Sequence, residues 1–198
     1  WTETTYKMDI FKNKNHIYLL SSPVGISLYD FYFESGLYTK NIDLVPIKHS
    51  IICQLIHILD CLFKSSINHC DLKPENIIIL EDGTMVLIDY GASFIFGTER
   101  LENIYTDVYS PPEKCKNHKS DIYSIGIIIN YILFMHDDPE QSYTPLGQSG
   151  AIDLTLLQDA RNFVKKLTVS NNDARPTIND ILTSDEPWNN WYKKVFTE

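Results

Sequence analysis

Apolar positions recur at helical spacing in three long segments of the chain. In residues 47–63 they return every three or four positions, which predicts a long and mostly buried helix. Residues 122–134 are almost continuously apolar, and residues 154–167 repeat the helical spacing. Residues 173–177 are expected to open a final helix, with a proline near its start.

Shorter apolar runs predict strands. Residues 6–10 alternate apolar and polar side chains, and residues 16–20 resume an apolar run after a polar turn, so this region is expected to form a hairpin. Two further short strands, 77–80 and 85–88, flank the turn at 81–84. The pattern therefore predicts an α+β chain that is mainly helical and carries small β elements.

Polar segments separate these elements. Residues 69–76 form a polar loop, and residues 89–119 form a long segment without periodicity, a length that in a compact domain usually has a functional reason. Ser120 or Asp121 is expected to cap the following helix. Residues 136–151 are predicted to form a surface loop.

Composition narrows the possible partners. The net charge of −9 argues against general binding to nucleic acid or to acidic membranes, and 43% hydrophobic residues in 198 suffice for one core. No leader or membrane span is expected, so the protein is predicted to be intracellular, cytoplasmic or nuclear. The start at Trp1 indicates a piece of a longer protein. The cysteines have no paired spacing, so no disulfide is expected and a reducing compartment is favoured; they are Cys53, Cys61, Cys70 and Cys115.

Four polar residues combine the groups that phosphoryl transfer needs. Asp71 offers a carboxylate to orient an attacking hydroxyl, and Lys73 offers a cation to the transferred phosphoryl group. Asn76 and Asp89 offer oxygen atoms to a magnesium ion. Any one of them alone is more simply explained as a turn or capping residue, since turns favour Asp and Asn for local reasons.

Together these motifs resemble the eukaryotic protein kinase family, Ser/Thr type. Residues 69–76 (HCDLKPEN) match its catalytic loop and residues 89–91 (DYG) its magnesium loop. Residues 106–113 (TDVYSPPE) are similar to its substrate-docking segment, and residues 120–126 to its central helix. The resemblance implies a protein kinase-like fold, with residues 1–25 as the remnant of the N-terminal lobe and hinge and residues 26–198 as the large C-terminal lobe.

The resemblance also implies ATP and Mg²⁺ as cofactors, protein substrates, and roles for further residues. The catalytic set would be Asp71, Lys73, Asn76 and Asp89. The residues around the adenine would be Ser22, Val24 and Ile78. The substrate-binding residues would be Thr106, Tyr109 and Pro111, with Lys73 and Thr106 indicating Ser/Thr as the acceptor. The structural residues would be His69, Glu113, Asp121 and Arg175, with Glu113 and Arg175 expected to form a buried ion pair.

The sequence departs from the family pattern in three ways. Cys70 stands where many members have an arginine that pairs with a loop phosphate, which predicts activity independent of such phosphorylation. Tyr90 replaces a phenylalanine and is expected to pack as an aromatic ring. The glycine-rich loop and strand lysine of the N-terminal lobe are missing, and the lysines at 7, 12 and 14 are poor substitutes. The missing lobe would come from the same protein or another chain.

Two other patterns have simpler explanations. Cys53, His57 and Cys61 share one helix face at four-residue spacing, but no fourth metal ligand is near in the sequence, and buried cysteine is common. Trp188 and Trp191 are expected to pack the last helix onto the domain rather than to bind a partner.

Three hypotheses about function follow. The first is the catalytic lobe of an active Ser/Thr protein kinase. The second is a truncated kinase-like regulator that binds and modulates another kinase without catalysis. The third is a small-molecule phosphotransferase, which would share the Asp and Asn but is not expected to have Lys73, the Pro-Pro-Glu segment or Arg175.

Overall fold

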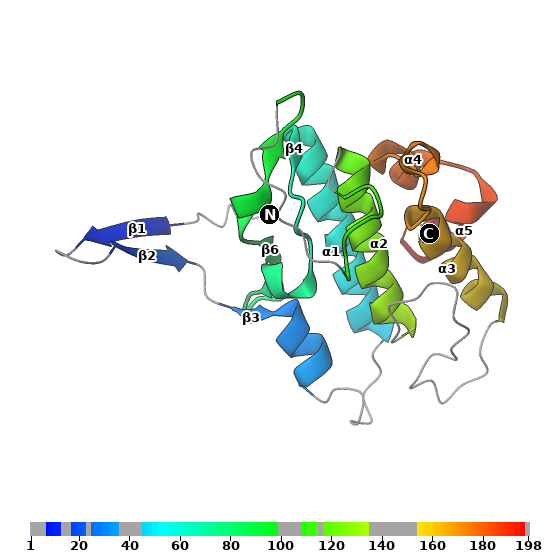
Figure 1. Cartoon of the computed structure of the whole chain (residues 1–198). Helices are drawn as coiled ribbons and strands as arrows, with labels where there is room; N and C mark the ends of the chain where they lie inside the picture. Colours follow the sequence, from blue (N-terminus) through cyan, green and yellow to red (C-terminus); the bar gives the residue numbers. More distant parts are fainter. Residues whose placement is uncertain are drawn as a thin grey trace.

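The computed structural model describes residues 7–12, 17–22, 25–35, 45–98, 108–114, 117–134 and 154–196, with the backbone alone for the first two ranges. The described part is mainly helical, with three small sheets beside the helices (Figure 1). This confirms the predicted fold class. The predicted loop at 136–151 lies outside the described residues.

Three long helices form the core. Helix α1 spans Val45–Lys64, α2 spans His118–Phe134 and α3 spans Leu154–Leu167, close to the segments that the apolar spacing predicts. Helix α2 runs beside α1 and contacts α3 (Figure 1). Because α2 is surrounded in this way, its apolar residues are buried all round rather than along one stripe.

Helix α1 has an unusual composition for its length. Among the described residues, only its segment Pro46–Lys64 is long and apolar enough to cross a membrane, judged by length and composition. Ile52 and Leu55 of this helix are fully buried against the rest of the core. Such burial accounts for the composition of a core helix.

The C-terminal region contains two short helices rather than the single final helix that was predicted. Arg175 and Thr177 have extended backbones, and helix α4 (Ile178–Thr183) begins only after them. Thr177 and Asp180 form a reciprocal capping box, which fixes this start. Helix α5 (Asn190–Phe196) follows.

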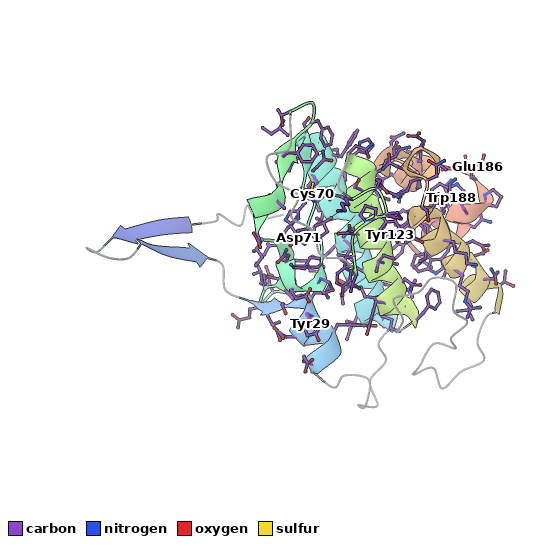
Figure 2. The ribbon with its side chains drawn as sticks, viewed as in Figure 1. Tyr29, Cys70, Asp71, Tyr123, Glu186 and Trp188 are labelled. Carbon is purple, nitrogen blue, oxygen red and sulfur yellow. The ribbon has the colours of Figure 1, made fainter. Side chains whose placement is uncertain are left out.

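The tryptophans pack as predicted. The ring of Phe163 on α3 lies 6.2 Å from that of Trp188, 5.3 Å from that of Trp191 and 5.7 Å from that of Tyr192. Trp188 lies on the α3 and α5 side of the molecule, away from Asp71 (Figure 2). These contacts attach the end of the chain to α3.

The strands form small antiparallel sheets. Strands β1 (Lys7–Lys12) and β2 (Ile17–Ser22) make the predicted hairpin and pair with no other described strand (Figure 1). Strand β3 (Ile26–Ser27) pairs with β5 (Ile77–Ile79), which pairs with β6 (Met85–Leu87). The second sheet thus joins the segment after the hairpin to the strands that follow the polar loop.

The prediction that residues 89–119 lack regular structure was wrong in part. Strand β7 (Phe94–Ile95) pairs with β4 (Ile67–Asn68), so this segment is bound back to the residues before the polar loop. Two-residue strands leave too little periodicity to be recognised in the sequence.

The predicted cap of α2 was also wrong. The helix begins at His118, and the Asn117 side chain accepts a hydrogen bond from the Lys119 N–H at 3.0 Å.

A π-helix at Asp30–Glu34 was not predicted. It follows β3, and the hydroxyl of Tyr32 within it donates to the Ile132 carbonyl of α2 at 2.5 Å. Burial raises the pKa of Tyr32, so the hydroxyl keeps its proton and remains a donor. This contact ties the segment after β3 to the central helix.

Candidate active site

The loop between β4 and β5 brings three of the predicted catalytic residues into contact. The Lys73 Nζ lies 2.8 Å from the Asp71 Oδ2. The Asn76 side-chain amide donates to the Asp71 carbonyl at 2.9 Å and contacts the Asp71 Oδ2 at 3.2 Å. Asp71 and Asn76 are buried and Lys73 is partly exposed, so the carboxylate is oriented by two neighbours from its own loop.

A buried carboxylate on α2 fixes the backbone before Asp71. The Asp121 side chain accepts hydrogen bonds from the N–H groups of His69 at 2.7 Å and Cys70 at 2.9 Å. Cys70 has a φ of 69°, a left-handed conformation that L-residues adopt at a cost. The two bonds from Asp121 stabilise that turn, which sets the direction of the next residue, Asp71.

His69 connects this loop to the end of β6. Its Nδ1 accepts from the Asp71 N–H at 3.3 Å, so its Nε2 is left to donate to the Ile88 carbonyl at 3.1 Å. Burial lowers the pKa of His69, and this outweighs the opposing hydrogen bond to Ile88 and the charges of Asp71 and Asp89. The ring is therefore neutral at pH 7 and acts as a bridge between two loops.

Asp89 lies immediately after that bridge. The Ile88 N–H donates to the Asn76 carbonyl at 2.9 Å, which places the residue before Asp89 against the catalytic loop. Asp89 itself has a left-handed backbone with φ 62°, and its Oδ1 accepts from the Gly91 N–H at 3.3 Å. Its side chain is exposed to solvent.

The oxygen atoms of Asn76 and Asp89 suit a hard divalent cation. Asn76 uses its amide nitrogen on Asp71, so its oxygen is the atom left for a cation. Asp89 uses one carboxylate oxygen on Gly91. Magnesium prefers carboxylate and carbonyl oxygens, so the donor set fits the predicted ion.

The structure describes only part of the predicted adenine site. Ser22 is the last residue of β2, its side chain is not described, and Val24 lies outside the described residues. Ile78 is half-buried in β5, opposite Ser27 and Val86. Gly25 approaches this strand so closely that an added Cβ would lie 2.3 Å from the Ile79 carbonyl oxygen and 2.6 Å from the Ile78 Cγ2.

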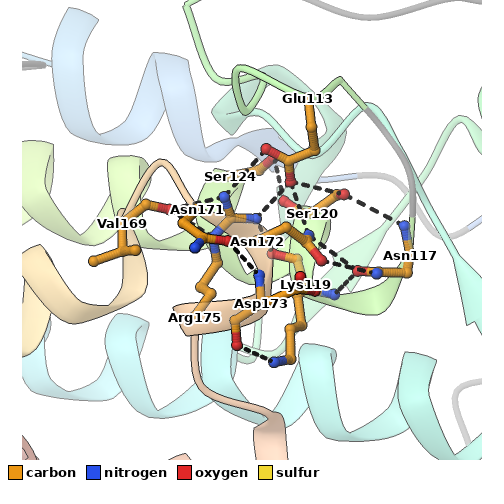
Figure 3. Close-up of polar contacts among 10 residues, drawn as sticks. All are labelled: Glu113, Asn117, Lys119, Ser120, Ser124, Val169, Asn171, Asn172, Asp173 and Arg175. Atoms are coloured by element: carbon orange, nitrogen blue, oxygen red, sulfur yellow. Dashed lines mark hydrogen bonds and ion pairs between the residues drawn. The ribbon is translucent and has the colours of Figure 1, made fainter.

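The predicted substrate-binding residues are divided in the same way. Thr106 lies outside the described residues, while Tyr109 and Pro111 are buried in the segment 108–114. These two side chains therefore anchor the segment to the body of the protein, while Val108, Pro112 and Lys114 are exposed. Glu113, in the same segment, forms the expected ion pair with Arg175 (Figure 3).

The Glu113–Arg175 pair is held by several further groups. The Arg175 guanidinium is fully buried, bonds both carboxylate oxygens at 2.8 and 3.3 Å, and donates to the Val169 and Lys119 carbonyls. It also lies 4.9 Å from the centre of the Tyr123 ring. Burial tends to raise the pKa of Glu113, but hydrogen bonds from Arg175 and the Asn172 side chain outweigh it and the pKa is lowered.

Two residues of this cluster, Asn172 and Asn117, were not identified from the sequence. Asn172 is buried and bonds both Glu113 and Asn117, although it lies more than 50 positions from either of them in the chain. No motif marks either asparagine. The only signal was their position next to Arg175 and to the start of the apolar segment that forms α2.

The cysteines differ from expectation at one position. Cys70 is disulfide-bonded, so the prediction that the cysteines do not pair was wrong there; Cys53 and Cys61 are free, and the partner lies outside the described residues. Disulfide partners are chosen by proximity in the fold, which spacing along the chain does not give. Cys61 Sγ lies 3.4 Å from His57 Nε2, and among the described residues no group of three His, Cys, Asp or Glu side chains could hold a metal ion.

Tyr90 packs against the catalytic loop. Its ring is in edge contact with that of His69, with centroids 5.0 Å apart, and half of the side chain is exposed. The exposed side borders a cavity of about 420 Å³ between α1 and β6, which Cys61 and Leu87 also line. The predicted aromatic packing of Tyr90 is present.

Comparison with known proteins agrees with this arrangement. The chain matches the protein kinase domain model over residues 5–188. It is 30% identical over 138 residues to a homologue of dual specificity tyrosine-phosphorylation-regulated kinase 3 from Drosophila melanogaster, covering 66% of this chain and 16% of the relative. It is 27% identical over 187 residues to calcium-dependent protein kinase 2 from Arabidopsis thaliana, covering 83% and 27%.

A further relative is CBL-interacting serine/threonine-protein kinase 15 from Arabidopsis thaliana, 24% identical over 161 residues, with 73% of this chain and 37% of the relative covered. The chain thus spans less than two fifths of the length of these curated relatives. The family model covers most of the chain and includes all four predicted phosphoryl-transfer residues. The chain belongs to the protein kinase family.

Proposed function

We propose that this chain is the catalytic lobe of a serine/threonine protein kinase that transfers the γ-phosphate of ATP to Ser or Thr of protein substrates. The observation that carries the proposal is the cluster of Asp71, Lys73 and Asn76, with Asp89 attached to it through the bond between Ile88 and Asn76. Phosphoryl transfer depends on positioned charges, and this cluster supplies one carboxylate, one cation and two oxygen ligands.

Each residue has one role in this proposal. Asp71 accepts a hydrogen bond from the substrate hydroxyl and orients it, and Lys73 neutralises charge on the phosphoryl group. Asn76 and Asp89 hold magnesium, which when bound neutralises the phosphate oxygens of ATP. Ser22, Val24 and Ile78 surround the adenine.

The preference for Ser/Thr rests on Lys73, which is 2.8 Å from Asp71, together with Thr106. One relative is called a serine/threonine-protein kinase and another a dual specificity kinase, so the relatives' names do not by themselves decide the acceptor. Tyr109 and Pro111 anchor the segment that presents the substrate. The intracellular location, cytoplasmic or nuclear, belongs to the same proposal.

The proposal includes a partner for the face beside β6. The phosphate clamp of the family needs a second lobe, from the same protein or from another chain. The exposed Tyr90 and the apolar cavity beside it lie next to the magnesium loop, where such a lobe would complete the nucleotide site. The β1–β2 hairpin, whose outer edges pair with no other described strand, would extend its sheet.

The decisive test is Asp89→Ala in the protein of full natural length. We expect the wild-type protein to transfer labelled phosphate from ATP to a basic protein in a magnesium-dependent reaction. In the variant the rate of transfer should fall at least about 100-fold, because the magnesium ion on the phosphates would lose one of its protein ligands. Asp82→Ala is the matched control, since Asp82 is an exposed turn residue whose carboxylate bonds the backbone and side chain of the nearby Thr84.

The control variant should retain the wild-type rate. No transfer by the wild-type protein of full length would contradict the enzyme proposal and favour the non-catalytic regulator. Equal losses of the transfer rate in Asp89→Ala and Asp82→Ala would mean that the loss does not come from removal of a magnesium ligand at Asp89.

A further inference from the structure

Asn172 forms a bridge between two parts of the chain. Only 8% of it is exposed, in the short turn before Arg175. Its Nδ2 donates to the Glu113 Oε1 at 2.9 Å and contacts the Asn117 Oδ1 at 3.2 Å, and its Oδ1 accepts from the Asn117 Nδ2 at 2.9 Å (Figure 3). Both ends of the amide are therefore used at once.

The two partners of Asn172 belong to different structural units. Glu113 lies near the end of segment 108–114, in which Tyr109 and Pro111 are buried. Asn117 immediately precedes α2, and its side chain accepts from the Lys119 N–H in the first turn of that helix. Asn172 thus ties the substrate-docking segment to the N-terminus of α2.

The same end of α2 also holds the catalytic loop. Asp121, in the first turn of the helix, accepts hydrogen bonds from the N–H groups of His69 and Cys70, the two residues immediately before Asp71. A displacement of the docking segment relative to the first turn of α2 is therefore a displacement relative to Asp71.

We propose that Asn172 is a positioning residue that fixes the substrate-docking segment relative to Asp71 by clamping Glu113 to Asn117. This role rests on the proposed kinase function. Arg175 holds Glu113 from the other side and bonds the Lys119 carbonyl, and the Ser120 Oγ donates to the Glu113 Oε1 at 3.3 Å. Among the described residues, Asn172 is the side chain that joins Glu113 to the side chain of Asn117, which caps α2. An amide is needed because it donates to a carboxylate and accepts from a second amide at the same time.

The chain offers a matched control in the adjacent residue. Asn171 is exposed, and its side-chain oxygen accepts a local hydrogen bond from the Asp173 N–H at 3.0 Å. Asn172→Ala removes all three bridge contacts, and Asn172→Asp loses the donor and places a second carboxylate beside Glu113. Asn171→Ala removes one side chain from the same turn and leaves the bridge in place.

The first measurement needs no enzymatic activity. Amide hydrogen exchange in segment 108–114, which includes the Lys114 N–H bonded to the Pro111 carbonyl, should be about tenfold faster in both Asn172 variants. It should be unchanged in Asn171→Ala. Amides of α1 and α3 should keep their protection in all variants, which separates local release of the segment from general destabilisation.

The second measurement is kinetic and uses the protein of full natural length. In the Asn172 variants the KM for a protein substrate should rise about fivefold or more, while the KM for ATP should change little, because the nucleotide residues are not held by Asn172. Exchange in segment 108–114 that matches Asn171→Ala, or equal rises in both KM values, would overturn the inference. If the wild-type protein transfers no phosphate, the kinase proposal fails, and the exchange measurement still decides whether Asn172 clamps the segment.

Discussion

At the scale of single residues, the buried polar groups decide which substitutions matter. Arg175 is fully buried and bonds Glu113 and the carbonyls of Val169 and Lys119. A buried ion pair gives weak evidence of net stabilisation, but the removal of one member leaves the other charge and its bonded groups without a partner in a poor solvent for charges. Substitutions in this buried pair should therefore lower the stability of the fold much more than substitutions in the exposed ion pairs.

Arg175→Ala is predicted to lower the free energy of unfolding by about 3–5 kcal/mol, because the Glu113 carboxylate loses its buried counter-charge and two carbonyls lose a donor. Urea denaturation followed by circular dichroism measures it. The control is Lys64→Ala, which removes an exposed lysine paired with Asp60 on α1 and should change stability far less, because water screens that pair. Similar losses in the two variants would mean that Arg175 is not the buried anchor described above.

At the scale of elements, the crossing of α2 and α3 depends on one glycine. A Cβ added at Gly126 would lie 2.8 Å from the Leu167 Cβ and 2.9 Å from the Thr168 Cγ2. Glycine in a helix interior costs about 1 kcal/mol relative to alanine. Here the close approach of the end of α3 makes glycine the residue that fits, and α2 in turn carries the Asp121 that holds the catalytic loop.

Gly126→Ala is therefore expected to destabilise the protein by about 1–3 kcal/mol in spite of the better helix propensity of alanine, because both neighbours must move. Thermal unfolding gives the measurement. Combining it with Thr168→Ser, which removes the crowded methyl group but keeps a hydroxyl, should recover part of the loss. A stabilised Gly126→Ala variant would show that propensity outweighs contact at this crossing.

At the scale of the whole molecule, the titrating groups make the fold sensitive to acid. Burial lowers the pKa values of His69 and His118, so below about pH 6.5 the unfolded chain binds protons that the folded chain does not. Glu113 acts in the same direction at lower pH, since its pKa is lowered and its contribution is lost as the carboxylate is protonated. Stability should consequently fall as the pH drops below neutrality.

His118 allows this dependence to be tested. Its ring lies 5.1 Å from that of Phe63 and 5.7 Å from that of Phe96, its buried Nε2 has no hydrogen-bond partner in the described part of the chain, and Lys119 adds a neighbouring positive charge. His118→Phe keeps an aromatic ring at this position and removes the imidazole that binds a proton. It should reduce the loss of unfolding free energy between pH 7.5 and 5.5, where each histidine contributes at most about 1.4 kcal/mol per pH unit. Urea titrations at the two pH values measure it, and an unchanged loss would exclude His118 as a source.

Much of the molecule was predictable because its cause is local. The apolar spacing identified all three long helices, and α3 matched its predicted ends because Leu154 and Leu167 bound a clear period. The turn chemistry at residues 81–84 located the β5–β6 pair. Motif spacing alone placed Asp71, Lys73 and Asn76 on one loop with Asp89 after the next strand, an arrangement that the geometry then showed in detail.

What the sequence by itself determined was the helices, the hairpins and the set of polar residues, because periodicity, turn preference and motif spacing act between near neighbours in the chain. Only the tertiary structure decided that β7 pairs with β4, that Asn117 rather than Ser120 or Asp121 caps α2, and that Cys70 is disulfide-bonded. The tertiary structure also decided that Asp121 bonds the backbone of the catalytic loop instead of capping α2, and that Asn172 bonds Glu113. The β4–β7 pairing and the contacts of Asp121 and Asn172 join residues about 26 to 60 positions apart. Which distant groups meet is set by the packing of the core, on which local preferences have no bearing.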